Sequence, residues 1–255
     1  MQTKVTVKQI KSKSFAESEA YKKLRTNIQF SGKDIRTIAF TSTCPNEGKS
    51  EISYRAACSM AAMGKKTIYV DSDLRNSTFV SKVVEDFKGE LKGLVHCLVG
   101  ENTLDEIIVQ TQVPNLDFIA IGAIPPNPSE LLSQEVFTDI IAELKKRYDY
   151  VIIDTSPSGF VVDGVVSCAA ADGVIYVVSS GNISAKAAKN AITELGNAGC
   201  RLIGCVLNKV NTKDYGEYGY GYGYGYGYTG AYAGKFAENS RKKGIFSTLF
   251  KKKGQ

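Results

Sequence analysis

The sequence predicts an α/β fold, in which a doubly wound and mostly parallel sheet carries helices on both faces. Short apolar runs rich in β-branched residues, typical of strands buried on both faces, alternate with longer stretches of helical periodicity. This alternation indicates βαβ units, whose parallel strands hold ligands at their carboxyl ends. The chain has 255 residues, enough for one sizeable domain of this kind.

The predicted elements follow one another in the order that this fold requires. The expected strands are 36–42, 67–71, 116–121, 150–154, 174–179 and 201–207. The expected helices are 16–30, 49–62, 104–109, 135–146 and 185–198. We therefore divide the chain into an N-terminal helical segment (1–35), a central α/β domain (36–210) and a flexible tail (211–255).

The first strand leads into a Walker A-like loop, Thr43-Cys44-Pro45-Asn46-Glu47-Gly48-Lys49-Ser50, and then into a helix. In such a P-loop, backbone N–H groups and the positive end of the helix face an anion. Lys49 is expected to bridge the β- and γ-phosphates of a nucleotide, and the Ser50 hydroxyl to bind Mg²⁺. The predicted nucleotide-binding residues are Thr43, Pro45, Asn46, Glu47, Gly48, Lys49, Ser50 and Glu51. The first glycine of the usual pattern is Thr43 here, so a chance strand–turn–helix is the alternative.

Three carboxylates follow predicted strands. Asp71 and Asp73 come at the end of one strand, with Arg75 close behind, and Asp154 ends another in a Walker B-like position. Because the carboxyl ends of parallel strands share one edge of a sheet, these groups are expected near the phosphate loop. A hard cation and an attacking hydroxyl both need such oxygens. Each acid alone is also compatible with a helix cap.

Composition excludes several other classes of function. The net charge of +6 belongs to the tail, because residues 1–234 carry equal numbers of acidic and basic side chains. A neutral body argues against nucleic-acid binding. The scattered cysteines and single histidine offer few zinc ligands. With no signal peptide and no apolar run long enough for a bilayer, we expect a cytoplasmic location.

The tail has a composition of its own. Eight of the fourteen tyrosines lie between residues 215 and 232, mostly alternating with glycine, and this pattern predicts a segment that does not build a core. The candidate phosphoacceptors are Tyr215, Tyr218, Tyr220, Tyr222, Tyr224, Tyr226, Tyr228 and Tyr232. Basic clusters with apolar residues between them follow, and they indicate either contact with a membrane or its protein, or a solvated lysine tail.

Together these motifs resemble the bacterial tyrosine kinases of capsule and exopolysaccharide operons, the BY-kinases, over nearly the whole chain. The resemblance rests on the phosphate loop, the Asp71-x-Asp73-x-Arg75 strand end, Asp154, the segment 125–132 (PPNPSELL) and the closing tyrosine cluster. It implies that 36–210 is an ATP-binding kinase domain that uses Mg²⁺. It also implies that tyrosine hydroxyls, in other proteins and in the tail, accept the γ-phosphoryl group.

The resemblance also implies roles for individual residues. The expected catalytic residues are Lys49, Asp71, Asp73 and Asp154. The expected metal ligands are Ser50, Asp71, Asp73 and Asp154. Asp71 is the candidate base for the tyrosine proton, although Asp71 and Asp73 are interchangeable in this respect. Asn208, which ends a predicted strand, resembles the base-contacting position of related ATPases; a turn asparagine is the alternative.

An assembly is implied as well. Glu19, Lys22 and Arg25 resemble a Glu-x-x-Arg-x-x-Arg motif that the family uses to form rings, by resemblance octamers, with a lysine in the middle place. Lysine keeps the charge but loses the bidentate fork of arginine, and a solvated helix face is the alternative reading. Short members of the family work beside a transmembrane activator, which implies a position at the inner face of the plasma membrane.

Two other classes of protein share some of these features. Partitioning and division-site ATPases have the same fold and act as nucleotide switches without phosphorylating protein. They carry a lysine early in the phosphate loop where this chain has Cys44. A binding module with a self-associating Tyr-Gly segment is the second rival. The tyrosine cluster favours the kinase.

Overall fold

The computed structural model describes residues 3–8, 10, 12, 14–77, 79–85, 89 and 91–210, without the side chains of Phe79 and Val80. The eight tail tyrosines predicted as phosphoacceptors lie outside the described residues. The strands are β1 (Lys4–Val7), β2 (Thr37–Ser42), β3 (Thr67–Asp71), β4 (Val84–Glu85), β5 (Val109–Thr111), β6 (Leu116–Ile119), β7 (Tyr150–Asp154), β8 (Gly173–Ser179) and β9 (Leu202–Asn208). The helices are α1 (Phe15–Phe30), α2 (Lys49–Ala61), α3 (Phe79–Val83), α4 (Leu94–Leu98), α5 (Leu104–Ile107), α6 (Pro128–Leu132), α7 (Glu135–Arg147), α8 (Val162–Ala169) and α9 (Ala185–Asn197).

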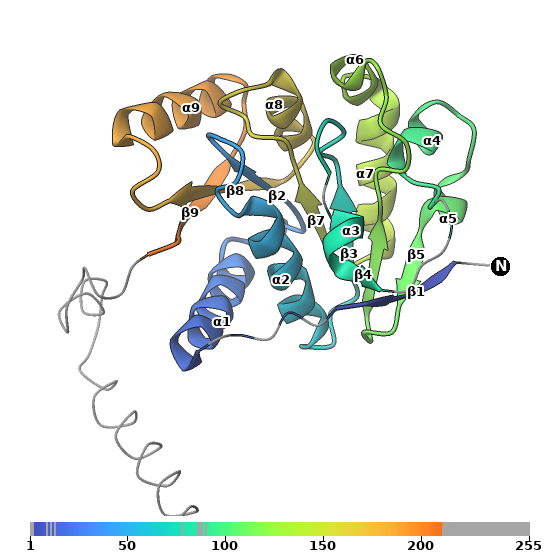
Figure 1. Ribbon diagram of the computed structural model, residues 1–255, viewed down its shortest axis with the longest axis horizontal. Helices are drawn as coiled ribbons and strands as arrows, with labels where there is room; N and C mark the ends of the chain where they lie inside the picture. The colour runs from blue at the N-terminus through green and yellow to red at the C-terminus, as the bar shows by residue number, and fades with distance from the viewer. Residues whose placement is uncertain are drawn as a thin grey trace, which may run out of the picture. The chain divides into compact units, whose positions relative to one another are not determined.

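The strands of this part of the chain form one sheet in the order β4-β1-β5-β6-β3-β7-β2-β8-β9 (Figure 1). From β6 to β9 all neighbours run parallel. The pairs β5–β6 and β1–β4 at the other margin are antiparallel. The predicted fold class, a doubly wound and mostly parallel sheet, is therefore confirmed.

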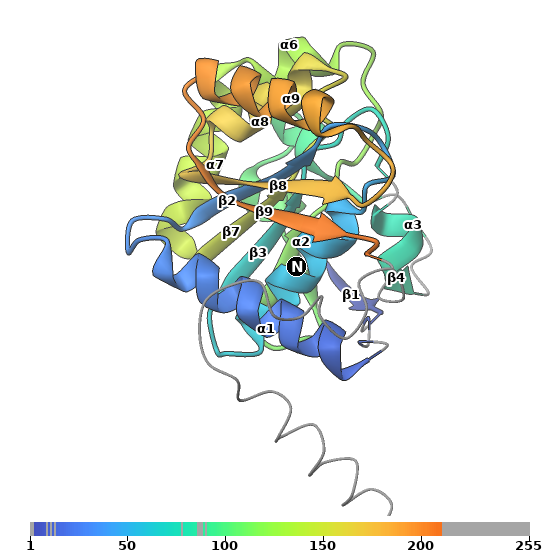
Figure 2. The same ribbon diagram turned by 90° about the vertical axis from the view of Figure 1, so that its left-hand side faces the viewer.

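Two helical layers enclose the sheet, with α1 and α2 on one face and α7, α8 and α9 on the other (Figure 2). Successive residues of a strand pack alternately into two hydrophobic cores, one on each face of the sheet. On β3, Ile68 and Val70 pack into the core under the α7–α9 layer, whereas Tyr69 packs into the core under α1 and α2. Such strands have no solvent-facing side, which explains why they read as continuous apolar runs.

Several short elements differ from the prediction. The strand β1 precedes α1, in a segment where only a helix was expected, and it pairs with β5 and β4. In β1 exposed and buried residues alternate over four positions, with Lys4 and Thr6 exposed. A sequence pattern of this length cannot be distinguished from that of a loop. The expected helix 104–109 ends at Ile107, and its last residue begins β5.

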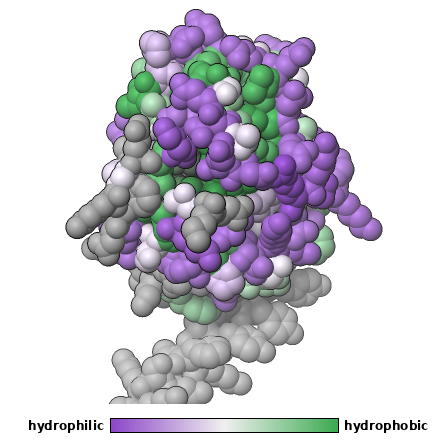
Figure 3. Space-filling model, turned by 90° about the vertical axis from the view of Figure 1, so that its right-hand side faces the viewer, coloured by the Kyte–Doolittle hydropathy of each residue, from purple (hydrophilic) through white to green (hydrophobic). Residues whose placement is uncertain are grey.

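The surface carries both hydrophilic and hydrophobic residues (Figure 3). Figure 3 shows a face covered mostly by hydrophilic residues, with hydrophobic residues gathered toward its upper part. Across the described ranges, every helix is too short or too polar to cross a bilayer.

A carboxylate fixes the end of the sheet that lies away from the phosphate loop. Asp172 Oδ2 accepts hydrogen bonds from the backbone N–H groups of Arg36 and Thr37, each at 2.9 Å, and Lys145 Nζ donates to Oδ1. Burial alone would raise the pKa of Asp172, but Lys145 and the backbone donors outweigh it, so the pKa is lowered. The carboxylate therefore joins the starts of β2 and β8.

We expect Asp172→Ala to lower the free energy of unfolding by about 1–3 kcal/mol at neutral pH, since the two backbone donors lose their acceptor. A group with a lowered folded-state pKa contributes stability above its unfolded pKa of about 3.9 and loses it as the pH falls through the folded value. The deficit should therefore shrink below about pH 4. Urea denaturation at several pH values measures it, with the exposed Asp139→Ala as the matched control; an equal deficit in both variants would contradict the assignment.

Candidate functional site

The phosphate loop between β2 and α2 is shaped by two residues with left-handed backbone. Asn46 has φ +63° and Gly48 has φ +95°. A Cβ added to Gly48 would lie 2.1 Å from Nδ2 of Asn208, so glycine is required there. The same Nδ2 donates to the carbonyl oxygen of Glu47 at 2.8 Å. Asn208, predicted to contact a nucleotide base, thus holds the loop backbone from the end of β9.

The side chain of Glu47 turns inward. It is fully buried, and its carboxylate accepts from the N–H groups of Cys44 at 2.7 Å and Ser179 at 2.9 Å. Thr43 is also buried, with its hydroxyl 2.7 Å from that of Tyr176. Glu47 and Thr43 therefore present only backbone to a phosphate. Their side chains brace the loop against β8.

Lys49, the first residue of α2, forms a buried ion pair with Asp73. The distance from Nζ to Oδ2 is 2.8 Å, and the residues are 8% and 5% exposed. Asp73 Oδ1 accepts from the hydroxyl of Ser156 at 2.8 Å, a contact that the sequence did not predict. Burial by itself would lower the pKa of Lys49, but the charges of Asp154 and Asp73 outweigh it and raise that pKa. The lysine is thus a fixed positive charge beneath the loop.

Asp71 and Asp154 lie side by side, because they are register partners at the ends of β3 and β7. Asp71 accepts from the Asp73 N–H at 3.1 Å and from the Ser77 hydroxyl. Burial and the charge of Asp154 raise the pKa of Asp71 to about 8. Asp154 accepts from the Tyr69 hydroxyl at 3.1 Å through Oδ2. Its Oδ1 is buried without a hydrogen-bond partner.

These oxygens fit a magnesium–nucleotide complex. Within the described ranges, no three His, Cys, Asp or Glu side chains form a ready-made cation cage. Mg²⁺ does not need one, since it is usually held by one or two carboxylates, water and substrate phosphates. The Oδ1 atom of Asp154, which has no hydrogen-bond partner, is a group of the required kind, and Ser50 follows Lys49 in the first turn of α2.

Asp73 and the loop border a cavity of about 620 Å³, which Lys49 and Ser50 also line. Asp71 and Asp154 are buried and are not among its lining residues. Its other lining residues are Ile10, Pro45, Asn46, Gly48, Glu51, Tyr54, Arg75, Asn76, Lys82, Val83, Ser156, Pro157, Phe160, Val161 and Lys209. Most of the residues predicted to bind nucleotide, all but Thr43, Glu47 and Asn208, therefore line one space. Glu51 is also engaged by Arg55, at 3.2 Å.

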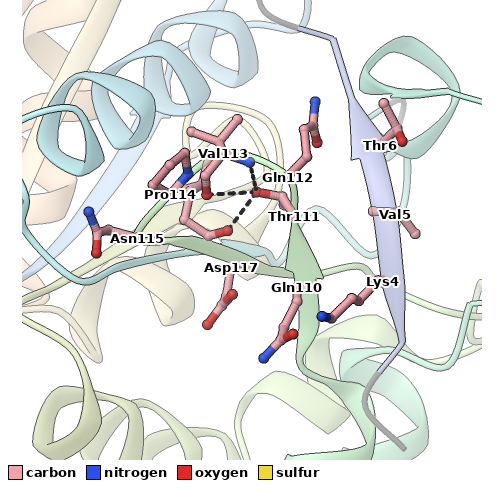
Figure 4. Close-up of a pocket in the computed structure, with 11 residues that line it drawn as sticks. Lys4, Val5, Thr6, Gln110, Thr111, Gln112, Val113, Pro114, Asn115 and Asp117 are labelled. Carbon is pink, nitrogen blue, oxygen red and sulfur yellow. Dashed lines mark hydrogen bonds between the residues drawn. The ribbon is translucent and has the colours of Figure 1, made fainter.

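A second cavity, of about 410 Å³, lies at the β1–β5 margin (Figure 4). The Thr111 hydroxyl in this cavity is bonded to backbone groups of Val113 and Leu116. Its charged lining residues are Lys4 and Asp117, and Asp117 already accepts from the Tyr148 hydroxyl at 2.8 Å. This cavity lacks an ion pair like that of Lys49 and Asp73, which line the first cavity.

Arg75 links the carboxylate loop to two later segments. Its Nε lies 2.5 Å from Oδ2 of Asp163, which is fully buried in α8, and it donates to Ser129 Oγ of α6 at 3.0 Å. Ser129 belongs to the 125–132 segment noted in the sequence. Asp163 was not predicted, since only the folded chain brings α8 beside the end of β3. The contact fixes the direction in which the chain leaves Asp73.

The residues predicted for oligomerisation lie along α1. Glu19 and Lys22 are exposed and pair with each other at 2.7 Å. Arg25 donates to the Ser59 hydroxyl of α2 at 3.2 Å. Two of the three are therefore open to the outside, while the third also joins α1 to α2.

Comparisons with known proteins place this site in a family. The family model described as an AAA domain matches residues 35–199. The tyrosine-protein kinase CpsD of Streptococcus agalactiae is 40% identical over 208 residues, covering 79% of this chain and 89% of that protein. The tyrosine-protein kinase YwqD of Bacillus subtilis is 35% identical, covering 80% and 85% respectively.

A solved structure agrees with these relatives. The chimerical protein CapA2B2 superposes with a TM-score of 0.71 and 31% identity, covering 81% of this chain and 93% of that one. The loop, its lysine and the strand-end carboxylates lie within the region that these matches span. The chain therefore belongs to the bacterial tyrosine-protein kinases, which carry a P-loop domain of the AAA type.

Proposed function

We propose that this chain binds Mg-ATP and transfers its γ-phosphoryl group to protein tyrosines, including the tyrosine cluster of its own tail. The observation that carries the proposal is the Lys49–Asp73 ion pair beneath the phosphate loop, beside the buried Asp71 and Asp154. The kinases named above support the tyrosine as acceptor. By the same relationship, we propose that the reaction regulates capsule or exopolysaccharide synthesis and export.

In this proposal the residues of the site have separate roles. Incoming phosphate oxygens compete with Asp73 for the Lys49 ammonium, so binding of ATP exchanges one partner of the lysine for another. Phosphoryl transfer needs mainly positioning and neutralisation of charge. Bound Mg²⁺, held by Ser50 and Asp154, would supply part of that neutralisation. Asp71 then accepts the phenolic proton, and a pKa of about 8 suits a base that works near neutral pH.

We further propose that the chain works as a homo-oligomer, a ring of eight by family resemblance, beside a transmembrane activator at the inner face of the plasma membrane. The exposed Glu19 and Lys22 support α1 as a contact surface. Arg25 would serve there in addition to its bond with Ser59.

Lys49→Met should reduce tyrosine phosphorylation by at least about 100-fold, because the transition state loses a preorganised charge. Mass mapping of phosphotyrosine after incubation with Mg-ATP measures the effect. The control is Lys186→Met, which removes an exposed lysine on α9 and should keep full activity. Retained transfer in Lys49→Met would disprove the role of Lys49.

Asp71→Asn and Asp73→Asn should both abolish transfer but change the stability of the nucleotide-free protein in opposite directions. Asp71→Asn removes a carboxyl whose ionised form is disfavoured by burial and by Asp154, so the melting temperature should rise, by an amount equivalent to about 1–3 kcal/mol. Asp73→Asn leaves Lys49 buried without its ion-pair partner, so the melting temperature should fall by a comparable amount. Scanning calorimetry without nucleotide tests both signs, and the same sign in both variants would contradict the electrostatic assignment.

Replacing the eight tail tyrosines with phenylalanine should abolish self-phosphorylation while leaving transfer to an added tyrosine peptide within about twofold, since the P-loop machinery is intact. Radiolabelled ATP distinguishes the alternatives. Label that appears only as free phosphate, even with the wild-type protein and its membrane activator, would instead support an ATPase switch of the partitioning or division-site kind.

A further inference from the structure

One side of the nucleotide cavity is apolar. Pro157, Phe160 and Val161, in the loop between β7 and α8, line it within a few residues of Asp154. The Phe160 side chain is large, yet the residue is 69% exposed. Charge neutralisation at a phosphate gives no reason for an exposed aromatic ring in this place. Aromatic rings at the mouth of a cavity commonly bind another ring.

Backbone contacts hold this loop in place. The N–H groups of Phe160 and Val161 both donate to the carbonyl oxygen of Pro157 at 3.2 Å. Ser158 N–H donates to the Thr41 hydroxyl of β2 at 3.2 Å. A Cβ on Gly159 would lie 2.7 Å from the Thr43 carbonyl oxygen, so the loop rests directly on the phosphate loop. The backbone carrying Phe160 therefore has a fixed position relative to the phosphates.

The sheet order separates this loop from the opposite end of the cavity. Asn208 and Lys209 come from β9, and Lys209 Nζ donates to the Asn46 carbonyl oxygen at 2.5 Å. The Phe160 loop follows β7, which lies on the other side of β2 and next to the strand that carries Asp71. The Phe160 side of the cavity is therefore the side nearer to Asp71, which is itself only 1% exposed. The ring is thus placed to contact the acceptor.

Basic residues line the same cavity. Lys82 of α3 is exposed, and Arg75 is partly so. Opposite charges attract across such a rim, so an acceptor with an acid beside its tyrosine is favoured. Two of the eight tail tyrosines carry such an acid: Asp214 precedes Tyr215 and Glu217 precedes Tyr218, and glycine follows both.

We propose that Phe160 packs against the phenol ring of the acceptor, and that the site prefers tyrosines preceded by an acid and followed by glycine, with Lys82 meeting the acid. The inference rests on the proposed kinase function and specifies its substrate class. An aromatic pair contributes about 0.5–1.5 kcal/mol, which corresponds to a change in affinity of roughly twofold to tenfold.

The test uses the full chain and a single-tyrosine peptide of residues 213–217 (KDYGE). Phe160→Ala should raise the peptide KM by about twofold to tenfold. Phe160→Trp should restore it, because a ring is present again. Val162→Ala is the matched control, since Val162 is 62% exposed and near in sequence but does not line the cavity. Because Phe160 is exposed, all variants should keep the wild-type melting temperature.

A second arm tests the charge preference. Changing the acid before tyrosine to lysine (KKYGE) should raise the KM with the wild type, and Lys82→Glu should reverse the preference between the two peptides. An unchanged peptide KM in Phe160→Ala, or a rise in the KM for ATP of the same size, would overturn the inference. If the wild type phosphorylates no peptide at all, the proposed function itself fails.

Discussion

The electrostatics of the whole site depend on the buried acidic residues at the carboxyl ends of β3 and β7. Asp71 and Asp154 face each other across adjacent strands, and Lys49 with Asp73 completes a compact group of one cation and three acids. Burying such a group is costly unless each charge has a partner. The structure reduces that cost by raising the pKa of Asp71, so that the excess of negative charge is partly removed by a proton. A cation or an incoming phosphate rearranges this balance, which links the occupancy of the site to its protonation.

The helices and loops around the site hold these charges at fixed positions. Asn208 secures the phosphate loop from β9, Glu47 braces it against β8, and Asp163 secures the chain beyond Asp73 through Arg75. Asn208 and Glu47 bond to backbone groups of a neighbouring segment, and Asp163 pairs with the side chain of Arg75. Positioning of this kind is what phosphoryl transfer requires, since its barrier falls mainly through orientation and preorganised charge.

The sequence predicts the parts of the fold that depend on continuous local patterns. The strands 67–71 and 150–154 have the predicted bounds, because both are buried on two faces and have a continuous hydrophobic interior. The strand β1 was not predicted, because it shows only four residues of alternating burial and lies near the margin of the sheet. At the site, residue types and order predicted Lys49, Asp73 and Asp154 near one another. The partners Ser156 and Asp163 did not follow from the sequence, because they lie 83 and 88 residues from Asp73 and Arg75 along the chain.

Contacts in the folded chain also explain why the phosphate loop can form with Thr43 in place of the first glycine of the usual pattern. A glycine is needed where the backbone must turn left-handed or pass close to another group, and Gly48 meets both conditions through its φ and its contact with Asn208. Thr43 meets neither: within the structure its φ is not among the positive ones, and its hydroxyl gains a partner in Tyr176. At that end of the loop the small residue is Gly159, which gives the Thr43 backbone the space it needs. The close contact at this end of the loop is thus made by Gly159, in the segment that carries Phe160. This segment joins the phosphate end of the site to its apolar side.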